Sequence, residues 1–420
     1  MASPNTDFED DLFAHVVPRE KWLSIALLSI CIVFGMSLWF SLSAVVPTLK
    51  TLYRLDDNHV ALLSSSVSVG FVVGTLTSAL LGLADLLPPR RYFALCALGG
   101  ATVNAVILLL DPSSTSVIVM RFLTGALMGG IYPVGMRMMA TWANGDTGVL
   151  IGILTSSICI GSGMPHLIDA FGGLNWVFTV AASSGLAFTA GIVVSFVQLG
   201  PRHIQAQRFK PAFAAYAWTV RPIRLANLGY WGHKWENFAM WAWIGPFLYL
   251  SFSLNPPAGW SDPALLARYV AFSVFFIGAP GCLIGGFLAD RFGRTLITSG
   301  ALVISGVCAV LAGLLFGGNP WLLTAVCLLW GFALIADSAQ FSSCIIELSD
   351  PNIVGTMLTM QTCVGFFITL VSIQLIPLIV DGLGWDWAMA SLAIGPVMGI
   401  WAMARLRRHP EAERLAGGRR

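Results

Sequence analysis

Four charged side chains lie inside long apolar stretches of this sequence. They are Arg121, Lys234, Glu236 and Asp337. An ionisable group at the middle of a membrane costs at least about 3 kcal/mol, so it persists only with a partner or a role. The two cations could hold an anion, and the two carboxylates could carry a proton. Two alternatives stay open: the four charges form purely structural pairs, or Lys234 extends to a nearby headgroup layer.

Further polar side chains share helical faces with these charges. His233 and Glu236 are three residues apart, as are Asp337 and Gln340, and this spacing places both members of a pair on one helical face. Hydrogen-bonding groups are added by Ser37, Ser41 and Tyr132. We therefore expect one polar pathway for solute and proton, made of Arg121, His233, Lys234, Glu236, Asp337, Gln340, Tyr132, Ser37 and Ser41.

The roles of the aromatic residues and of one further histidine are less specifically indicated by the sequence. The cavity walls could include Trp39, Trp235, Trp241 and Trp330, although aromatic side chains in a bilayer more often pack or anchor at the interface. We expect His166 to be a helix-end histidine whose hydrogen bonds are satisfied.

The composition requires a membrane environment for these residues. Apolar residues make up 56% of the chain and charged residues 10%, whereas roughly a quarter of the residues of a soluble domain are charged. About twelve windows are long enough to cross the hydrocarbon layer as helices. They run over residues 22–48, 60–83, 92–110, 116–141, 147–168, 176–199, 225–254, 269–289, 295–315, 321–348, 353–380 and 387–404. The acidic segment before the first window favours a retained span over a removed signal peptide.

Lysine and arginine are distributed unevenly between alternate loops. With the amino terminus inside, the outer loops carry only Lys50, Arg54 and Arg268, and the remaining basic residues outside the apolar stretches fall in the inner loops and tails. Because cytoplasmic loops carry the excess of positive charge, both termini are expected in the cytoplasm of a multi-pass inner-membrane protein.

The chain divides near its midpoint. Residues 200–224 form the one long polar, basic stretch inside it. Asp85 and Asp290, like Trp176 and Trp385, recur at nearly the same offset, which indicates a duplication. We expect a cytoplasmic tail over 1–21, a six-helix bundle over 22–199, a cytoplasmic linker over 200–224, a second six-helix bundle over 225–404 and a basic cytoplasmic tail over 405–420.

The segment from Gly286 to Thr295 is a charged island between two apolar windows, and residues 81–91 are a degenerate copy of it. Its sequence resembles the conserved loop motif of the major facilitator superfamily. Arg121 to Gly125, with Gly129, is similar to that family's fourth-helix motif. The resemblance implies an all-α membrane protein with twelve helices in two pseudo-symmetric bundles around a central cavity.

By this resemblance the loop motif is a gate that stabilises one access state. The gate residues are Asp85, Arg90, Arg91, Gly286, Asp290, Arg291, Gly293 and Arg294. The first copy has Pro88 and Pro89 in place of the glycine turn, and Pro fixes φ, so this copy is expected to work differently. Glycine pairs four residues apart, such as Gly125 with Gly129, predict close helix packing.

These features together predict a secondary transporter that moves a small organic solute by alternating access. Arg121 is the expected contact for an anionic group. Burial favours a protonated carboxylate and a neighbouring cation favours an ionised one, so Glu236 or Asp337 could exchange a proton as the cavity opens. One alternative is a proton antiporter that exports amphiphilic or toxic compounds, and a distant one is a membrane enzyme or metal-binding protein that uses His233 with Glu236.

The sequence indicates no cofactor. It contains no GxxxxGK[ST] loop, no HExxH and no CxxC, and its eight cysteines lie in apolar windows. The expected partners are a small-molecule substrate, protons and membrane lipids. We expect a monomer that is not an enzyme and binds no nucleic acid.

Overall fold

The computed structural model of this protein describes residues 18–81, 83, 87–143, 147–173, 175–201, 210–256, 259, 262–350 and 352–420. All regular elements in this part of the chain are helices. Before the linker these are α2 (Pro18–Met36), η1 (Ser43–Val45), α3 (Val46–Tyr53), α4 (Asp57–Leu81), α6 (Pro89–Val106), η2 (Ile107–Leu109), α7 (Thr115–Met128), α8 (Tyr132–Ala140), α9 (Thr147–Phe171), α10 (Trp176–Val193) and η3 (Val194–Phe196).

The remaining helices belong to the linker, the second half and the tail. They are η4 (Pro211–Phe213), α11 (Tyr216–Thr219), α12 (Arg221–Leu254), α13 (Pro263–Phe292), α14 (Arg294–Leu314), α15 (Pro320–Ala336), α16 (Ser338–Leu348), α17 (Val354–Leu383), α18 (Trp385–Ser391), α19 (Ile394–Arg407) and η5 (Pro410–Gly418). The predicted all-α membrane fold is confirmed.

Ten helical stretches in the described residues are long and apolar enough to cross a membrane. The first and seventh predicted spans correspond to α2 and α12, which carry more polar side chains. Arg19, Glu20 and Lys21 begin α2, and α12 includes His233, Lys234 and Glu236. With these two helices the described chain contains the twelve predicted spans.

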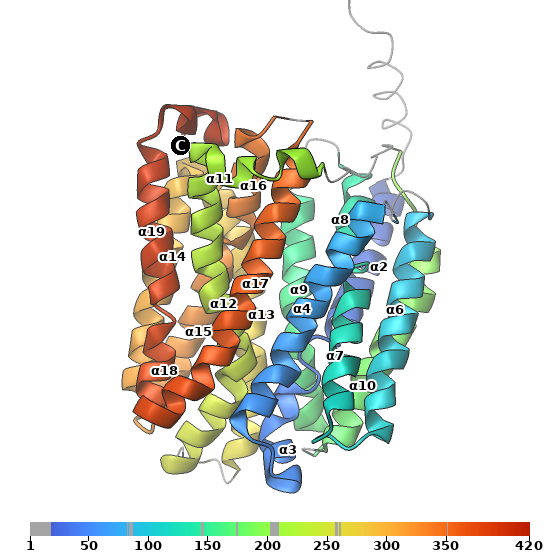
Figure 1. Ribbon diagram of the computed structural model, residues 1–420, viewed down its shortest axis with the longest axis vertical. Coiled ribbons are helices and arrows are strands. Elements are labelled where there is room, and N and C mark those ends of the chain that lie inside the picture. The colour runs from blue at the N-terminus through green and yellow to red at the C-terminus, as the bar shows by residue number, and fades with distance from the viewer. Residues whose placement is uncertain are drawn as a thin grey trace, which may run out of the picture.

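The two halves of the chain lie side by side as roughly parallel groups of helices (Figure 1). They meet along two helix pairs, α4 with α17 and α9 with α13. One end of the molecule carries α11 and the C-terminal tail, and the opposite end carries α3 (Figure 1). We call these the tail end and the α3 end.

Glycines allow very close helix contacts at matching places in the two halves. A side chain at Gly125 of α7 would collide with the backbone of Val67 in α4. A side chain at Gly285 of α13 would collide with the backbone of Ala336 in α15. The predicted packing role of these glycines is therefore confirmed.

Four spans predicted as continuous are broken in the structure. The first breaks between α2 and α3, the fourth between α7 and α8, the tenth at Asp337 between α15 and α16, and the twelfth between α18 and α19. Pro47 and Pro133 lie in the first turns of α3 and α8, where proline cannot donate to the preceding turn. We find no comparable sequence signal at Asp337. The break after α2 leaves the carbonyls of Leu38 and Trp39 free to accept from Arg121, and the break after α15 places Asp337 against His233.

Candidate functional site

Arg121 of α7 is fully buried inside the first half and bound by neutral acceptors. Its Nη1 donates to Leu38 O at 2.9 Å, Ser41 Oγ at 3.0 Å and Asn104 Oδ1 at 3.1 Å. Its Nη2 donates to Trp39 O, and its Nε donates to a backbone oxygen of α4 at 3.3 Å. The guanidinium therefore holds the unwound end of α2 against α4 and α6. All of these partners are neutral oxygens, and the role of Arg121 as an anion contact stays a prediction.

The two predicted serines also bond within the first half. Ser41 joins the Arg121 network and its Oγ donates to Leu38 O at 3.0 Å. Ser37 Oγ donates to Phe34 O at 2.7 Å and lies 3.3 Å from Ser183 O of α10. Both are buried, so neither is available to a solute in this conformation.

Glu236 of α12 holds the second half together in a comparable way. Its Oε1 accepts from Trp330 Nε1 at 2.7 Å and its Oε2 accepts from Ser305 Oγ at 3.0 Å. The carboxylate thus joins α12 to α14 and α15, as Arg121 joins three helices of the first half. His233 takes no part in these contacts, and the prediction that His233 and Glu236 serve one site stays a prediction.

His233 instead faces Asp337. His233 Nδ1 lies 2.9 Å from Asp337 Oδ1, and both side chains are almost wholly buried. His233 Nε2 lies 3.1 Å from Asn237 Nδ2. The facing atoms are at ion-pair distance, but neither His233 Nδ1 nor Asp337 Oδ1 makes a hydrogen bond of good geometry among the described residues. The break at Asp337 therefore creates a buried pair that can exchange one proton.

Lys234 occupies the adjacent position on α12 and is 7% exposed. Its ammonium lies 4.6 Å from the ring centroid of Phe238, 5.0 Å from Phe366 and 5.3 Å from Tyr230. Among the described residues no carboxylate lies within 4 Å of it. The closest contacts of this buried cation are therefore ring faces.

Lys234 also lies where the two halves meet. Cys159 of α9, in the first half, and Asp337, in the second half, both lie within electrostatic range of its ammonium. Tyr132, the first residue of α8, lies within the same range of Tyr230. The structure thus brings His233, Lys234 and Asp337 together, and Glu236 also lies within electrostatic range of Asp337. Arg121, Ser37 and Ser41 bond inside the first half instead.

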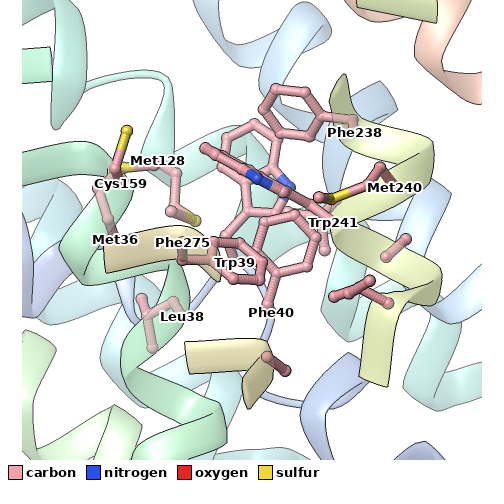
Figure 2. Packing of buried hydrophobic residues seen from close by; sticks show 14 of the residues in the cluster. Met36, Leu38, Trp39, Phe40, Met128, Cys159, Phe238, Met240, Trp241 and Phe275 are labelled. Carbon is pink, nitrogen blue, oxygen red and sulfur yellow. The ribbon is translucent and has the colours of Figure 1, made fainter. Parts of the chain in front are cut away.

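Aromatic rings from both halves pack together in a cluster (Figure 2). We call it the central aromatic cluster; it contains Trp39, Phe40, Phe71, Phe238, Trp241, Phe275 and Phe366. The ring centroids of Trp39 and Phe238 are 5.1 Å apart, and those of Phe71 and Phe366 are 4.7 Å apart. Because Phe238 and Phe366 also flank Lys234, the site and the cluster are continuous.

A second buried ion pair joins the halves near the α3 end, and the sequence analysis missed it. Asp169 Oδ2 of α9 lies 2.6 Å from Arg268 Nε of α13. Arg268 was assigned to an outer loop, but it lies inside α13 and is 4% exposed. Both residues fall at the edges of apolar windows, so neither was counted as a membrane charge.

His166 lies one turn before Asp169 and also differs from its expectation. It is buried, and neither ring nitrogen has a hydrogen-bond partner among the described residues. The predicted satisfied helix-end histidine is therefore wrong.

At the tail end, Arg294 of the loop motif is the centre of a polar network. It binds Glu347 of α16 through two bonds, of 2.6 and 2.9 Å, and pairs with Asp290 at 3.3 Å. Its Nη1 donates to Gln340 Oε1 at 2.6 Å, so Gln340 belongs to this network and not to the central site. Gly286 lies on α13 near Gln340, and Gly293 adopts a φ of +101°, which favours glycine.

The other predicted gate residues have weaker contacts. Arg291 is exposed and stacks over Phe292, and Arg90 donates to Val197 O at 3.3 Å. Arg91 is exposed. Asp85 lies outside the described residues. No group of three His, Cys, Asp or Glu side chains within the described ranges is arranged to hold a metal ion.

Comparisons with known proteins agree on one family. A family model described as the Major Facilitator Superfamily matches residues 26–373. An uncharacterized MFS-type transporter, YfnC of Bacillus subtilis (strain 168), is 24% identical over 389 residues, which cover 90% of this chain and 91% of YfnC.

Two solved structures share the fold at low sequence identity. The nucleoside transporter NupG has a TM-score of 0.67 and 16% identity, with 92% of this chain and 99% of NupG covered. A bacterial homolog of the human lysosomal transporter Spinster, in an inward-facing and unoccupied conformation, has a TM-score of 0.68 and 13% identity, with 93% and 98% covered.

Proposed function

Because this chain belongs to the major facilitator superfamily and is a multi-pass secondary transporter of a small molecule, we propose that its solute is a small organic anion whose movement is coupled to protons. The observation that carries the proposal is Lys234, a buried cation between the halves with no carboxylate within 4 Å among the described residues. A buried cation that no carboxylate contacts directly is costly, so the anionic group of a solute would stabilise this site.

The other buried cations support the choice of Lys234. Arg121 donates to neutral oxygens throughout, and Arg268 is paired with Asp169. Neither guanidinium can bind a solute without breaking contacts that hold helices together. Lys234 gives up only ring contacts, each worth about 0.5–2 kcal/mol. We therefore assign Lys234 as the anion contact, in place of Arg121.

The proton is assigned to His233 and Asp337, next to Lys234 on the same helix and at the break of the tenth span. When Asp337 is ionised, its charge compensates Lys234 at longer range. When Asp337 takes up a proton, Lys234 loses that compensation and binds the solute anion more strongly. Proton and anion then bind together and leave together, and the loaded site carries no added charge.

We propose that the tail end faces the cytoplasm. Helix α11 of the linker and the arginine-rich tail lie at this end (Figure 1), and the tail contacts the Arg294 network through Glu347, as the positive-inside rule expects. The division into bundles over 22–199 and 225–404, joined by the linker 200–224, belongs to the same proposal. A single chain supplies both halves, so a monomer is the proposed working unit.

A second candidate is export of an amphiphilic anion. The central aromatic cluster, with Met128 and Met240 beside it (Figure 2), offers the adaptable apolar surface that such compounds require. The direction of net flux under an imposed pH gradient separates the two: symport moves anion and proton the same way, and antiport moves them in opposite ways.

The proposal can be tested by a thermal-shift screen on the purified protein, because a ligand that binds the folded state raises its melting temperature. Organic acids should stabilise the protein, while neutral compounds of matched shape should not. The Lys234→Met variant should lose this response, and Lys210→Met, in the exposed linker segment, should keep it. An acid that stabilises Lys234→Met as well as the wild type would refute the assigned anion contact.

A further inference from the structure

The corner where α9 meets α13 at the α3 end holds charged groups that the proposed solute site does not use. Asp169 Oδ1 accepts from Thr179 Oγ1 at 3.0 Å, and Asp169 Oδ2 accepts from Arg268 Nε at 2.6 Å. Arg268 Nη1 also donates to Ala264 O at 3.1 Å. Since α9 belongs to the first half and α13 to the second, this ion pair must separate when the halves part at the α3 end.

His166 is the third ionisable residue of this corner. It lies three residues before Asp169 on α9, so both project from one side of the helix. Its side chain is 1% exposed, and its ring lies 5.5 Å from that of Phe275 of α13. Gly245 of α12 packs so close that a Cβ there would lie 3.0 Å from the imidazole Cε1.

The surroundings of His166 contain one cation and one anion. Of the elements packed on this part of α9, α13 contributes Arg268, α10 contributes Thr179 and α12 contributes Gly245. The short helix η1 contains Ser43, Ala44 and Val45, none of which is charged. Helix α2 contacts α9 at Gly161, more than one helical turn from His166. Arg268 is thus the charged group that the described structure places within electrostatic range of the imidazole, and Asp169, one turn further along α9, binds this arginine.

This arrangement accommodates a neutral imidazole only. A buried imidazole without a hydrogen-bond partner already costs about 1–3 kcal/mol. A protonated one would add a second positive charge beside Arg268, with a single carboxylate to serve both. That carboxylate is fully engaged by Arg268 and Thr179. Protonated His166 is therefore incompatible with the closed corner and compatible with a parted one that admits water.

We propose that His166 is the proton-binding residue of a gate, formed with Asp169 and Arg268, that opens the α3 end on protonation. The gate is distinct from the His233 and Asp337 pair and needs no solute to respond. With the α3 end facing outward, acid outside the cell would favour the conformation that collects protons and solute there.

Pulsed EPR distances between the two halves test this inference on the full-length reconstituted protein. Spin labels at Thr115→Cys and Leu322→Cys report on the first turns of α7 and α15, which are exposed and belong to different halves. The eight buried native cysteines are replaced beforehand. A histidine side chain changes from mostly neutral at about pH 7.5 to mostly protonated at about pH 5. When the pH is lowered over this range, the population with the longer distance between the two spin labels should rise several-fold.

Two histidine variants and one control decide the outcome. His166→Asn and His166→Gln should hold the short distance at both pH values. His59→Asn, at a histidine on α4 outside this corner, should respond like the wild type. Asp169→Asn should shift the population toward the long distance even at neutral pH. The proposal is overturned if both His166 variants keep the wild-type response, or if the wild type shows no change with pH.

Discussion

Asp169 and Arg268 connect the two halves of the molecule through an ion pair of 2.6 Å whose side chains are 0% and 4% exposed. Removing one partner leaves the other as an uncompensated buried charge, which typically costs about 3–5 kcal/mol. We therefore expect Asp169→Asn and Arg268→Gln each to lower the melting temperature of the purified protein clearly.

The double variant Asp169→Asn with Arg268→Gln should be more stable than the sum of the two single effects predicts, because no buried charge remains. A double-mutant cycle of unfolding free energies measures this coupling. Strictly additive losses would show that the two side chains do not depend on each other.

The positions of most membrane charges could be predicted from the sequence, but the residues that they contact could not. The spans, the repeated halves and the loop motif around Arg294 follow from local patterns, and the structure bears out the helical fold. Which groups meet depends on contacts between distant segments. Asp169 and Arg268 are 99 residues apart, so no helical spacing could pair them.

Helix breaks explain several of the remaining differences. Polar residues three apart share a face only while the helix is continuous. Asp337 ends α15, so it meets His233 of α12 while Gln340 turns to Arg294. Arg121 was predicted to bind an anionic group, but in the structure it donates to neutral backbone oxygens of the unwound segment after α2.

Arg121 should therefore act on stability and not on solute affinity. Lysine cannot reproduce the planar set of donors that reaches Leu38, Ser41 and Asn104. We expect Arg121→Lys to lower the unfolding free energy by roughly 2 kcal/mol or more, because several buried acceptors lose their donor. The folded fraction should bind the solute with wild-type affinity in a titration. A selective loss of affinity with unchanged melting temperature would restore Arg121 as the anion contact.

Lys234 should behave in the opposite way. Lys234→Met keeps much of the side-chain volume and removes a buried charge that has only ring contacts. Replacing such a charge with an apolar group is often neutral or stabilising by about 1–4 kcal/mol. We expect an equal or higher melting temperature without ligand and no stabilisation by organic acids. A strongly destabilised variant would indicate a structural role for the ammonium.

The C-terminal tail should stabilise the Arg294 network. In η5, Ala412 and Leu415 are fully buried, and Ala416 N donates to Glu347 Oε2 at 3.0 Å. Arg419 Nη1 donates to Asp290 O at 2.5 Å. Removing residues 409–420 should lower the unfolding free energy, and burial of the leucine alone accounts for roughly 2 kcal/mol.

Glu411→Gln is the matched control for the tail, since Glu411 is exposed and, among the described residues, its carboxylate pairs with exposed Arg414 alone, at 3.4 Å. Its free energy of unfolding should stay within about 0.5 kcal/mol of the wild-type value. If truncation and control behave alike, the tail is not a stabilising element.

Flux through the Asp337→Asn variant tests the coupling of anion and proton most directly. A radiolabelled organic acid identified by thermal shift is followed in proteoliposomes under an imposed pH gradient. A gradient of one pH unit is worth about 1.4 kcal/mol per coupled proton. We predict that the wild type accumulates the acid on the alkaline side, while Asp337→Asn still exchanges labelled for unlabelled acid without accumulating it. Accumulation by Asp337→Asn at the wild-type level would contradict the account.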